Sequence, residues 1–492
     1  MVRGDHFTIP TEVSRITKAL ENAGFEAYLV GGCVRDLFLE KTPKDWDITT
    51  NATPEQIQGL FENTYYNNDY GTVGVVNDGA EDETLKVVEV TPYRTESAYS
   101  DARRPDSVTF GVSLEEDLKR RDFTINAIAY SVSKGHAVDP HKGQSDLKDK
   151  IIRAVGKPEE RFAEDALRIL RAVRISAELG FSIEQETLAA LKKTAQNLNK
   201  IAKERIRDEL SRILMSPNPR EGLLLAEHLG VLAFVVPDLR RGMGIDQNQA
   251  HKYDVFEHNL RTLQHAADKN WPLDIRLAGM LHDISKPETR RWSDEKKDWT
   301  FYGHDVVGGR LARKILTDLK FSAKNVDKIG KLVRWHMFFS DPDKITLSAV
   351  RRIIRNVGPE HIWELLDLRV CDRIGTGRPK EQPFRFRKYK SMVEEALRDP
   401  ISVGMLALDG TDLMKLAGEE PGPKIGFVLH ALLEEVLDDP AKNTKEYLES
   451  KAKSLIKLPT SELAELGQKG RERREEEEGK EIKKLRDKYW VT

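Results

Sequence analysis

The sequence predicts an α+β domain at the start of the chain, followed by a long region that is mostly helical. Short apolar runs separated by turn residues, as in strands, occur within the first 155 residues. From residue 158 onward, apolar residues recur instead with helical spacing. A later histidine-rich block and a charge-dominated end complete the pattern. We therefore divide the chain at 1–155, 156–240, 241–390, 391–466 and 467–492.

The composition predicts a soluble, cytoplasmic protein with more than one domain. The chain has 492 residues, of which 39% are hydrophobic and 33% charged, and its formal net charge is −2. Overall charge therefore provides no attraction to nucleic acid, and an RNA or DNA site would have to be a local patch. No apolar run is long enough for a membrane span, and the first ten residues lack the apolar centre of a signal peptide. Cys33 and Cys371 cannot form a disulfide framework, which indicates a reducing compartment.

The strands and helices are predicted from apolar runs and their spacing. Ala27–Val30 is a continuous apolar run and is expected as a buried strand, and 72–76 and 86–91 are expected as two more. Ser113 and Glu116 have the spacing of a capping box, which predicts that a helix begins there. The stretch 123–130 is expected to continue as helix. Beyond it, helices are predicted over 161–179, 183–195 and 203–214.

A glycine pair follows the first strand. Gly31 and Gly32 allow a close approach of the backbone to a ligand, and the start of the next helix offers free N–H groups to phosphates. Arg35 adds a positive charge. An ordinary tight turn between a strand and a helix explains the same residues equally well.

Three carboxylates form the first candidate catalytic group. Asp45 and Asp47 are two residues apart, a spacing that places them on one face of a strand and suits divalent cations. Glu89 alternates with apolar residues in the predicted strand 86–91. Three carboxylates on adjacent strands meet the need of a two-metal phosphoryl-transfer site. For the first pair alone, an exposed Asx turn is the simpler explanation.

Two further polar stretches could bind a nucleotide. In 120–129, Arg121 is one of two adjacent arginines that could bind phosphates, and Asp122 and Asn126 are one helical turn apart. In 164–174, we expect Asp165 and Arg168 on one helix face, with Arg171 and Arg174 following. From that helix alone, a surface ion pair between Glu164 and Arg168 is favoured.

Histidines and aspartates recur in the second half of the chain with the order of a metal site. Neutral imidazole binds transition metals, and a His-Asp pair supplies two ligands from one short segment. The candidate ligands are His258, His282, Asp283, His304, His336 and Asp372. A single His-Asp pair is usually structural, but four such elements in order on predicted helices favour a metal site.

The motifs at 28–47, 120–129 and 164–174 resemble those of the class II tRNA nucleotidyltransferases, a family that includes CCA-adding enzymes and bacterial poly(A) polymerases. The resemblance covers residues 15–240 and implies a polymerase-β-like nucleotidyltransferase head, followed by mostly helical neck, body and tail domains. It implies tRNA, CTP and ATP as substrates and Mg²⁺ as the cofactor of the head. No protein partner is inferred.

The same resemblance implies a role for each candidate residue. Asp45 and Asp47 would bind Mg²⁺, and Glu89 would be the third catalytic carboxylate. The nucleotide would be bound by Gly31, Gly32, Arg35, Arg121, Asp122, Asn126, Asp165, Arg168, Arg171 and Arg174. Asp165 and Arg168 would pair with the base: a carboxylate accepts from the amine of cytosine or adenine, whereas uracil and guanine present a carbonyl there.

The histidine-rich block resembles the HD metal-dependent phosphohydrolase domain. On that resemblance His258, His282, Asp283 and Asp372 would bind a divalent transition metal, although Asp367 lies close to Asp372 in the sequence. His304 and His336 would complete a second metal site or bind phosphate. The implied chemistry is phosphatase or 2′,3′-cyclic phosphodiesterase activity on RNA ends.

Several activities are compatible with the sequence. Arg103 and Arg104 resemble the flexible loop of members that add the terminal A, and 68–73 lacks the basic, aromatic signature usual in poly(A) polymerases. CCA addition is therefore the prediction. The alternatives are poly(A) polymerase, an A-adding specialist, or an HD phosphohydrolase that uses the head as an RNA-binding module.

Overall fold

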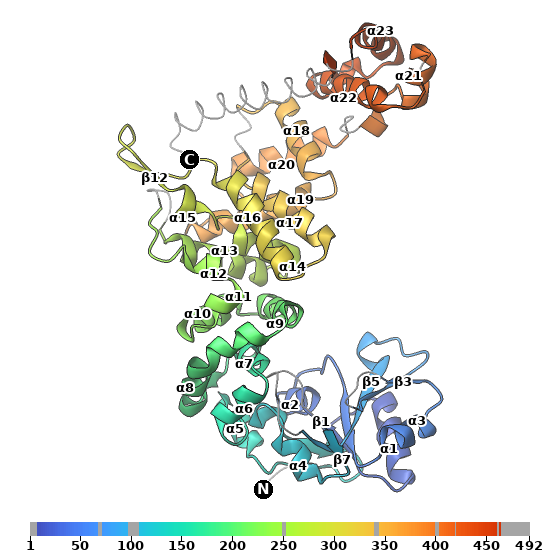
Figure 1. Cartoon of the computed structure of the whole chain (residues 1–492), viewed down its shortest axis with the longest axis vertical. Coiled ribbons are helices and arrows are strands. Elements are labelled where there is room, and N and C mark those ends of the chain that lie inside the picture. Colours follow the sequence, from blue (N-terminus) through green and yellow to red (C-terminus); the bar gives the residue numbers. More distant parts are fainter. Residues whose placement is uncertain are drawn as a thin grey trace. The chain divides into compact units, whose positions relative to one another are not determined.

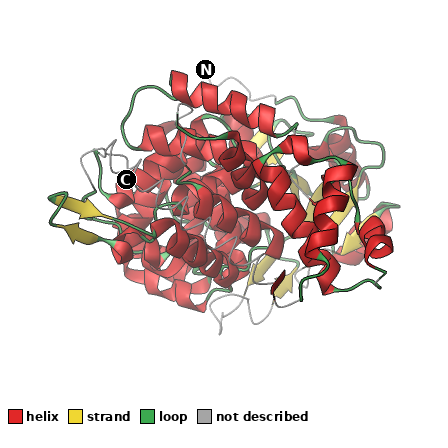
Figure 2. Ribbon diagram, turned by 90° about the horizontal axis from the view of Figure 1, so that it is seen from above, coloured by secondary structure: helices red, strands yellow, loops and turns green. Residues whose placement is uncertain are grey.

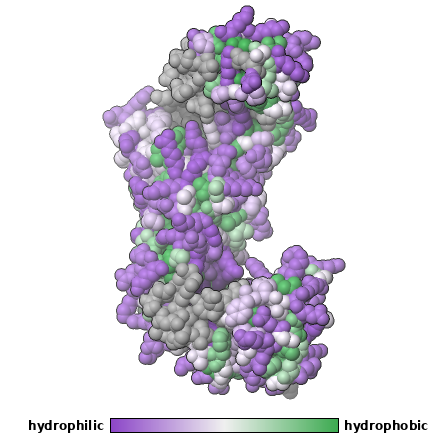
Figure 3. All heavy atoms as spheres, turned by 45° about the vertical axis from the view of Figure 1, so that its right-hand side comes forward, coloured by the Kyte–Doolittle hydropathy of each residue, from purple (hydrophilic) through white to green (hydrophobic). Residues whose placement is uncertain are grey.

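The computed structural model describes residues 7–66, 71–96, 108–247, 252–338, 344–398, 403–418, 420–459 and 462–463. The chain divides into two compact units, Met1–Pro237 and Asp238–Thr492. Arg103, Arg104 and the charged segment 467–492 lie outside the described residues. One face of the molecular surface is mostly hydrophilic (Figure 3), in keeping with the high charged content.

The first unit is built around a mixed seven-stranded sheet with the order β3-β4-β5-β2-β1-β8-β9 (Figure 1). The strands of this sheet are β1 (Ala27–Val30), β2 (Asp47–Thr50), β3 (Thr64–Tyr66), β4 (Val73–Val76), β5 (Val87–Pro92), β8 (Ala129–Ser131) and β9 (His136–Val138). Only β2 and β5 pair in parallel among these described strands. Two small pairs accompany it: β6 (Arg94–Glu96) with β7 (Val108–Phe110), and β10 (Ile151–Ile152) with β11 (Ser182–Ile183).

Short helices surround this sheet. They are α1 (Thr11–Asn22), α2 (Gly32–Phe38), α3 (Pro54–Leu60), α4 (Leu114–Lys119), α5 (Gly143–Asp149) and the 3₁₀ turns η1 (Glu83–Leu85) and η2 (Thr124–Asn126). The predicted capping box begins α4: the Ser113 hydroxyl accepts from the Glu116 N–H, and the Glu116 carboxylate accepts from the Ser113 N–H. The three predicted strands are present as β1, β4 and β5. The predicted alternation is also present in β5, where Val88 and Val90 are fully buried and Glu89 between them is exposed.

The predicted helix over 123–130 is wrong. The segment instead forms the 3₁₀ turn η2 and then the strand β8, which pairs with β1. Phe123 forms an isolated bridge with Ala154, and Val30, Leu118 and Ala129 form a buried cluster. A short apolar run is compatible with a helix or a strand, and the available edge of β1 decides between them.

Helices complete the first unit. They are α6 (Pro158–Glu164), α7 (Leu167–Leu179), α8 (Gln185–Thr194), η3 (Ala195–Lys200), α9 (Lys203–Met215), α10 (Pro219–His228), α11 (Leu232–Val235) and α12 (Pro237–Arg240), the last spanning the unit boundary. The single helix predicted over 161–179 is in fact two helices. Asp165 between them has extended backbone angles and accepts a hydrogen bond from the Leu167 N–H, which begins α7.

The described part of the second unit is helical apart from one hairpin, which appears as a pair of yellow arrows in Figure 2. Its elements are α13 (Val255–Asp268), α14 (Leu273–Leu281), α15 (Lys286–Thr289), β12 (Arg291–Ser293), β13 (Asp298–Thr300), α16 (His304–Asp318), α17 (Ala323–Trp335), α18 (Leu347–Val357), α19 (Ile362–Gly375), α20 (Phe384–Ala396), η4 (Val403–Met405), α21 (Gly410–Ala417), α22 (Pro423–Asp438), η5 (Pro440–Lys442) and α23 (Lys445–Leu455). Helix α13 packs against α14 and α19, and α16 packs against α17. Among the described residues, no helix combines the length and apolar character that crossing a membrane requires.

Candidate active site of the first unit and candidate metal centre of the second

The three predicted carboxylates meet at the centre of the sheet. Asp47 is the first residue of β2 and stands directly opposite Glu89 in the parallel register of β2 and β5. Asp45 lies in the bend just before β2, and not in the strand as predicted. It still faces the same site, because its Oδ1 is 3.8 Å from where a side chain on Gly32 would begin. The carboxyl groups thus converge from two adjacent strands and the loop before them.

The electrostatics of this group fit a bound cation. Burial and the neighbouring Asp45 and Glu89 raise the pKa of Asp47 from 3.8 to about 7, against the opposing effect of Arg121 and Arg171. The charged form of Asp47 is therefore disfavoured by its burial first, and also by the two neighbouring carboxylates. Hard divalent cations with oxygen ligands relieve this kind of repulsion. The carboxylates fit Mg²⁺ by their donor chemistry.

The glycine turn brings the backbone close to these carboxylates. Gly31 has φ of 81°, a value that L side chains rarely adopt. A Cβ at this position would lie 3.3 Å from Arg121 Nη1 and 3.5 Å from Asp47 Oδ2. The backbone angle of Gly31 therefore favours glycine, and any side chain there would contact Arg121 and Asp47 closely.

A pocket beside the carboxylates is lined mainly by arginines. Its lining residues are Gly31, Gly32, Arg35, Asp45, Asp47, Arg120, Arg121, Asp122, Asn126, Arg168, Arg171, Arg174 and Arg212. Most of the predicted nucleotide-binding residues are in this set, although Glu89 and Asp165 are not among the described residues that line it. Arg212 was missed by the sequence analysis. It lies on α9, and only the packing of α7 against α9 brings it to the pocket.

Asp122 organises the polar floor of the pocket. Its carboxylate accepts from the Phe123 N–H and from the Asn126 side chain at 3.1 Å, and it pairs with Arg171 at 2.9 Å. Arg35 in turn donates to Asn126 Oδ1 at 3.1 Å. The contact between Asp122 and Asn126 thus forms across the 3₁₀ turn, without the helix that was predicted there. Burial raises the pKa of Asp122, but Arg171 and Asn126 hold it below its usual value.

Asp165 and Arg168 do not share a helix face, contrary to the prediction. Asp165 lies in the break before α7, and its carboxylate pairs with Arg205 of α9 at 2.8 Å. Arg168 is on α7 and donates to Glu164 at 2.7 Å, so the predicted pair forms, but Arg168 is buried and the pair is not on the surface. Arg168 also donates to the Arg120 carbonyl oxygen. Only Arg168 of the two lines the pocket.

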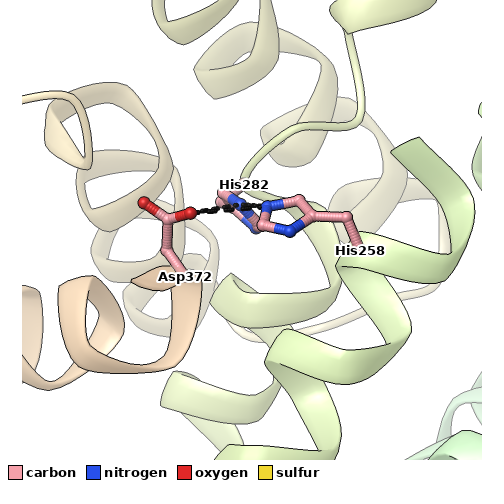
Figure 4. A group of neighbouring side chains, drawn as sticks. All are labelled: His258, His282 and Asp372. Atoms are coloured by element: carbon pink, nitrogen blue, oxygen red, sulfur yellow. Dashed lines mark hydrogen bonds and ion pairs between the residues drawn. The ribbon is translucent and has the colours of Figure 1, made fainter. Parts of the chain in front are cut away.

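The second unit brings the predicted metal ligands together in two buried groups. One group is His258, His282 and Asp372, shown in Figure 4, and the other is Asp283, His304 and His336. Within each group the candidate ligand atoms lie within 4.8 Å of one another. Asp372 of α19 lies 3.4 Å from His258 Nε2, so Asp372 is in the group and Asp367 is not.

Asp283 belongs to the second group and lies between the histidine pairs of the two groups. Its Oδ2 is 3.2 Å from His258 Nε2 and 3.3 Å from His282 Nε2, and its Oδ1 is 3.3 Å from His304 Nε2 and 3.5 Å from His336 Nε2. One carboxylate therefore faces four imidazoles, with one oxygen toward each pair. This arrangement suits a carboxylate shared by two metal ions.

The histidines are oriented as metal ligands by their second ring nitrogens. The Nδ1 atoms of His282, His304 and His336 each lie within 2.8 Å of a backbone carbonyl oxygen three residues earlier. An N–H donated there leaves Nε2 as the free electron pair for a metal. The Nε2 atoms of His258 and His282 are 2.9 Å apart, so a proton or a cation is needed between them.

The charged groups of the second centre shift one another's pKa values. Burial lowers the pKa of His258, but hydrogen bonds with Asp283 and Asp372 raise it to about 9. Burial also raises the pKa of Asp283, yet His282 and Lys286 hold it well below its usual range. Lys286 Nζ contacts Asp283 Oδ2 at 2.6 Å. Asp283 and Asp372 are thus charged, and a metal ion can replace the proton that His258 holds in its absence.

Comparisons with known proteins agree with this architecture. A model of the poly A polymerase head domain matches residues 27–153, a model of a probable RNA- and SrmB-binding site of polymerase A matches 180–243, and an HD-domain model matches 255–375. Together with the two sites, these matches define a nucleotidyltransferase that carries an HD domain.

Relatives along nearly the whole chain identify the family. The CCA-adding enzyme of Limosilactobacillus reuteri is 48% identical over 443 residues, which is 90% of this chain and 96% of that protein. The CCA-adding enzyme of Levilactobacillus brevis is 33% identical over 446 residues, 90% of this chain and 98% of that protein. The chain belongs to the family of CCA-adding enzymes, as the sequence motifs predicted.

The fold prediction is confirmed by a solved structure. The crystal structure of the Bacillus stearothermophilus CCA-adding enzyme in complex with CTP matches with a TM-score of 0.66 and 29% identity. The match covers 91% of this chain and 98% of that one. A nucleotidyltransferase head followed by largely helical regions is therefore the fold of this protein.

Proposed function

We propose that this chain adds CMP and AMP from CTP and ATP to the 3′ end of tRNA, with Asp45, Asp47 and Glu89 as its catalytic carboxylates. The observation that carries the proposal is the register of Asp47 opposite Glu89, beside a pocket lined by arginines. In the reaction, the tRNA 3′-oxygen bonds to the α-phosphorus, the bond to the β-phosphate breaks, and pyrophosphate leaves.

The chain's own groups divide this task. When bound by Asp45 and Asp47, Mg²⁺ would offset the triphosphate charge and make the attacking hydroxyl more acidic. Arg35, Arg121 and the backbone at Gly31 and Gly32 hold the phosphates. Asp122, fixed by its pairing with Arg171, positions the sugar.

To select the base, Asp165 and Arg168 would have to contact the nucleotide while they keep their ion pairs with protein side chains. Asp165 is held by Arg205, and Arg168 by Glu164. These ion pairs fix the orientation of both side chains, so the protein itself can present them to the base in place of a nucleic-acid template. A carboxylate at Asp165 accepts from the amine of cytosine or adenine, whereas the carbonyl of uracil or guanine leaves it facing another acceptor.

Changing Asp165 to asparagine tests this role. We expect Asp165→Asn to reduce the preference for CTP and ATP over UTP and GTP by about tenfold to a hundredfold, because an amide can donate to a carbonyl and an unsatisfied buried group costs about 1–3 kcal/mol. The ratio of kcat/KM values measures it. Asp208→Asn, the same change at an exposed position of α9, is the control and should leave the ratio unchanged. Equal ratios for both variants would remove Asp165 from base selection.

Primer extension tests the overall proposal. tRNA transcripts ending before CCA, after CC and after CCA receive CTP, ATP or both, with Mg²⁺, and the products are sized to one nucleotide. We expect addition that stops at CCA. Long A-tails would indicate a poly(A) polymerase, addition only to the CC end would indicate an A-adding specialist, and no addition would contradict the proposal.

A second activity is favoured by the carboxylate of Asp283 between two groups of ligands. We propose that the HD centre hydrolyses phosphate esters at RNA ends. A metal ion held there would lower the pKa of a water molecule, whose oxygen would bond to the phosphorus while the P–O ester bond breaks and the alcohol leaves. His258, His282 and Asp372 would hold one ion, His304 and His336 the other, and Asp283 both. Arg369, which contacts Asp372 Oδ2 at 2.6 Å, holds that ligand in place.

A further inference from the structure

An aromatic hairpin extends from the helices of the second unit. It is formed by β12 and β13, whose residues Trp292 and Trp299 pair directly across the strands. Trp292 is 50% exposed, and Tyr302 just beyond β13 is 52% exposed. Figure 1 shows the hairpin, labelled β12, directed away from the helices of its unit. A single exposed aromatic side chain is ordinary, but several exposed together on one element mark an interaction site.

Two rings of the hairpin contact each other, and a cation lies beside two of its rings. The Trp292 and Trp299 rings meet edge to face with centroids 5.4 Å apart. The Arg290 guanidinium lies 3.8 Å from the centroid of Trp299, and Lys296 Nζ lies 5.5 Å from that of Tyr302. Aromatic faces bordered by cations are the surfaces on which proteins stack the bases of single-stranded nucleic acid.

Both ends of the hairpin connect to the HD centre. Before β12, helix α15 begins with Lys286, which contacts Asp283 at 2.6 Å. After β13, the Phe301 carbonyl oxygen lies 2.7 Å from His304 Nδ1. Lys286 Nζ also lies 5.6 Å from the centroid of the Phe301 ring. The hairpin is thus the connection between two candidate metal ligands.

We propose that this hairpin is a platform on which the bases of a single-stranded RNA end stack while its terminal phosphate enters the HD centre. The stacking of bases on the hairpin is argued from the exposed rings. The entry of the phosphate into the HD centre rests on the phosphohydrolase activity proposed above. Residues 290–298 contain four basic and three acidic side chains, so general attraction to phosphates is weak there. Base stacking must therefore supply most of the affinity.

Trp292 fluorescence tests the platform independently of hydrolysis. The probe is a short single-stranded RNA of C and A with a 3′-phosphate, and its counterpart carries abasic sugars at every position. We expect the base-bearing probe to quench the emission that is lost in Trp292→Phe, and the abasic probe to leave it unchanged. No quenching, or equal quenching by both probes, would overturn the proposal whether or not the HD centre is active.

Hydrolysis kinetics test the second half. In the full chain, Trp292→Ala combined with Tyr302→Ala should lower kcat/KM for the base-bearing probe by about tenfold or more, mainly through KM. Hydrolysis of p-nitrophenyl phosphate, which has no base, should stay at the wild-type rate. Trp363→Ala, on α19 and 38% exposed, is the control and should change neither. Equal loss on both substrates would overturn the platform, and wild-type inactivity on both would instead contradict the hydrolase.

Discussion

Replacing Asp47 with asparagine is expected to lower nucleotide addition by roughly a thousandfold, the effect of removing one charged group that acts in the transition state. Asp47 stands at the start of β2, directly opposite Glu89. An amide of the same shape keeps the packing but loses the negative charge that holds a cation. Single-turnover addition of CMP to a tRNA lacking CCA measures the change.

The same variant should remain folded, which separates chemistry from stability. The pKa of Asp47 is raised from 3.8 to about 7 in the folded, metal-free protein. Because the charged form of Asp47 is disfavoured in the folded state, the stability of the fold falls as the pH rises from 3.8 to about 7. Above about pH 7, Asp47→Asn should therefore unfold in EDTA at the wild-type temperature or above it.

The matched control for this experiment is Asp149→Asn. Asp149 ends α5 in the same unit and is exposed, so the same loss of charge there should leave nucleotide addition unchanged. HD-centre hydrolysis by Asp47→Asn should also match wild type. If Asp47→Asn added nucleotides normally, the assignment of the catalytic carboxylates would be wrong.

Replacing Asp283 with asparagine is expected to lower HD-centre hydrolysis by roughly a thousandfold and to reduce the bound metal. The reason is geometric, since its two oxygens face two different pairs of histidines within 3.5 Å. In asparagine, an amide N–H₂ group replaces one of these oxygens, so one pair of histidines would no longer face an oxygen ligand. Hydrolysis of a 2′,3′-cyclic nucleotide and metal content by mass spectrometry measure both effects.

Nucleotide addition gives the internal control for Asp283. The HD centre and the head lie in separate compact units, so Asp283→Asn should add CMP and AMP at the wild-type rate. Asp318→Asn, an exposed aspartate at the end of α16, should affect neither activity nor metal content. Retained hydrolysis in Asp283→Asn would contradict the shared-carboxylate assignment, and an inactive wild type would contradict the hydrolase.

Local patterns in the sequence were enough to predict the core of the first site. A short strand, a glycine pair and alternating acids specify their own geometry over a few residues, because strand side chains alternate and a glycine permits a positive φ. The strand Ala27–Val30, the capping box at Ser113 and the exposure of Glu89 between buried valines follow from this. The order of histidines and aspartates by itself likewise indicates a metal centre.

Long-range packing decided the remainder. The stretch 123–130 has an apolar pattern that suits a helix or a strand, and the free edge of β1 made part of it the strand β8. Asp165 left the helix because its carboxylate begins α7 and pairs with Arg205, forty residues later. Arg212 reaches the pocket only through the packing of α9 on α7.

The second centre shows the same division most clearly. The sequence by itself determined which residue types are present and in what order, which was sufficient to identify the family and the candidate ligands. It could not show that Asp283 lies between two groups, because that position depends on four helices meeting around one side chain. Chain spacing carries no information on such distances, since they arise from the burial of apolar helix faces far apart in the sequence.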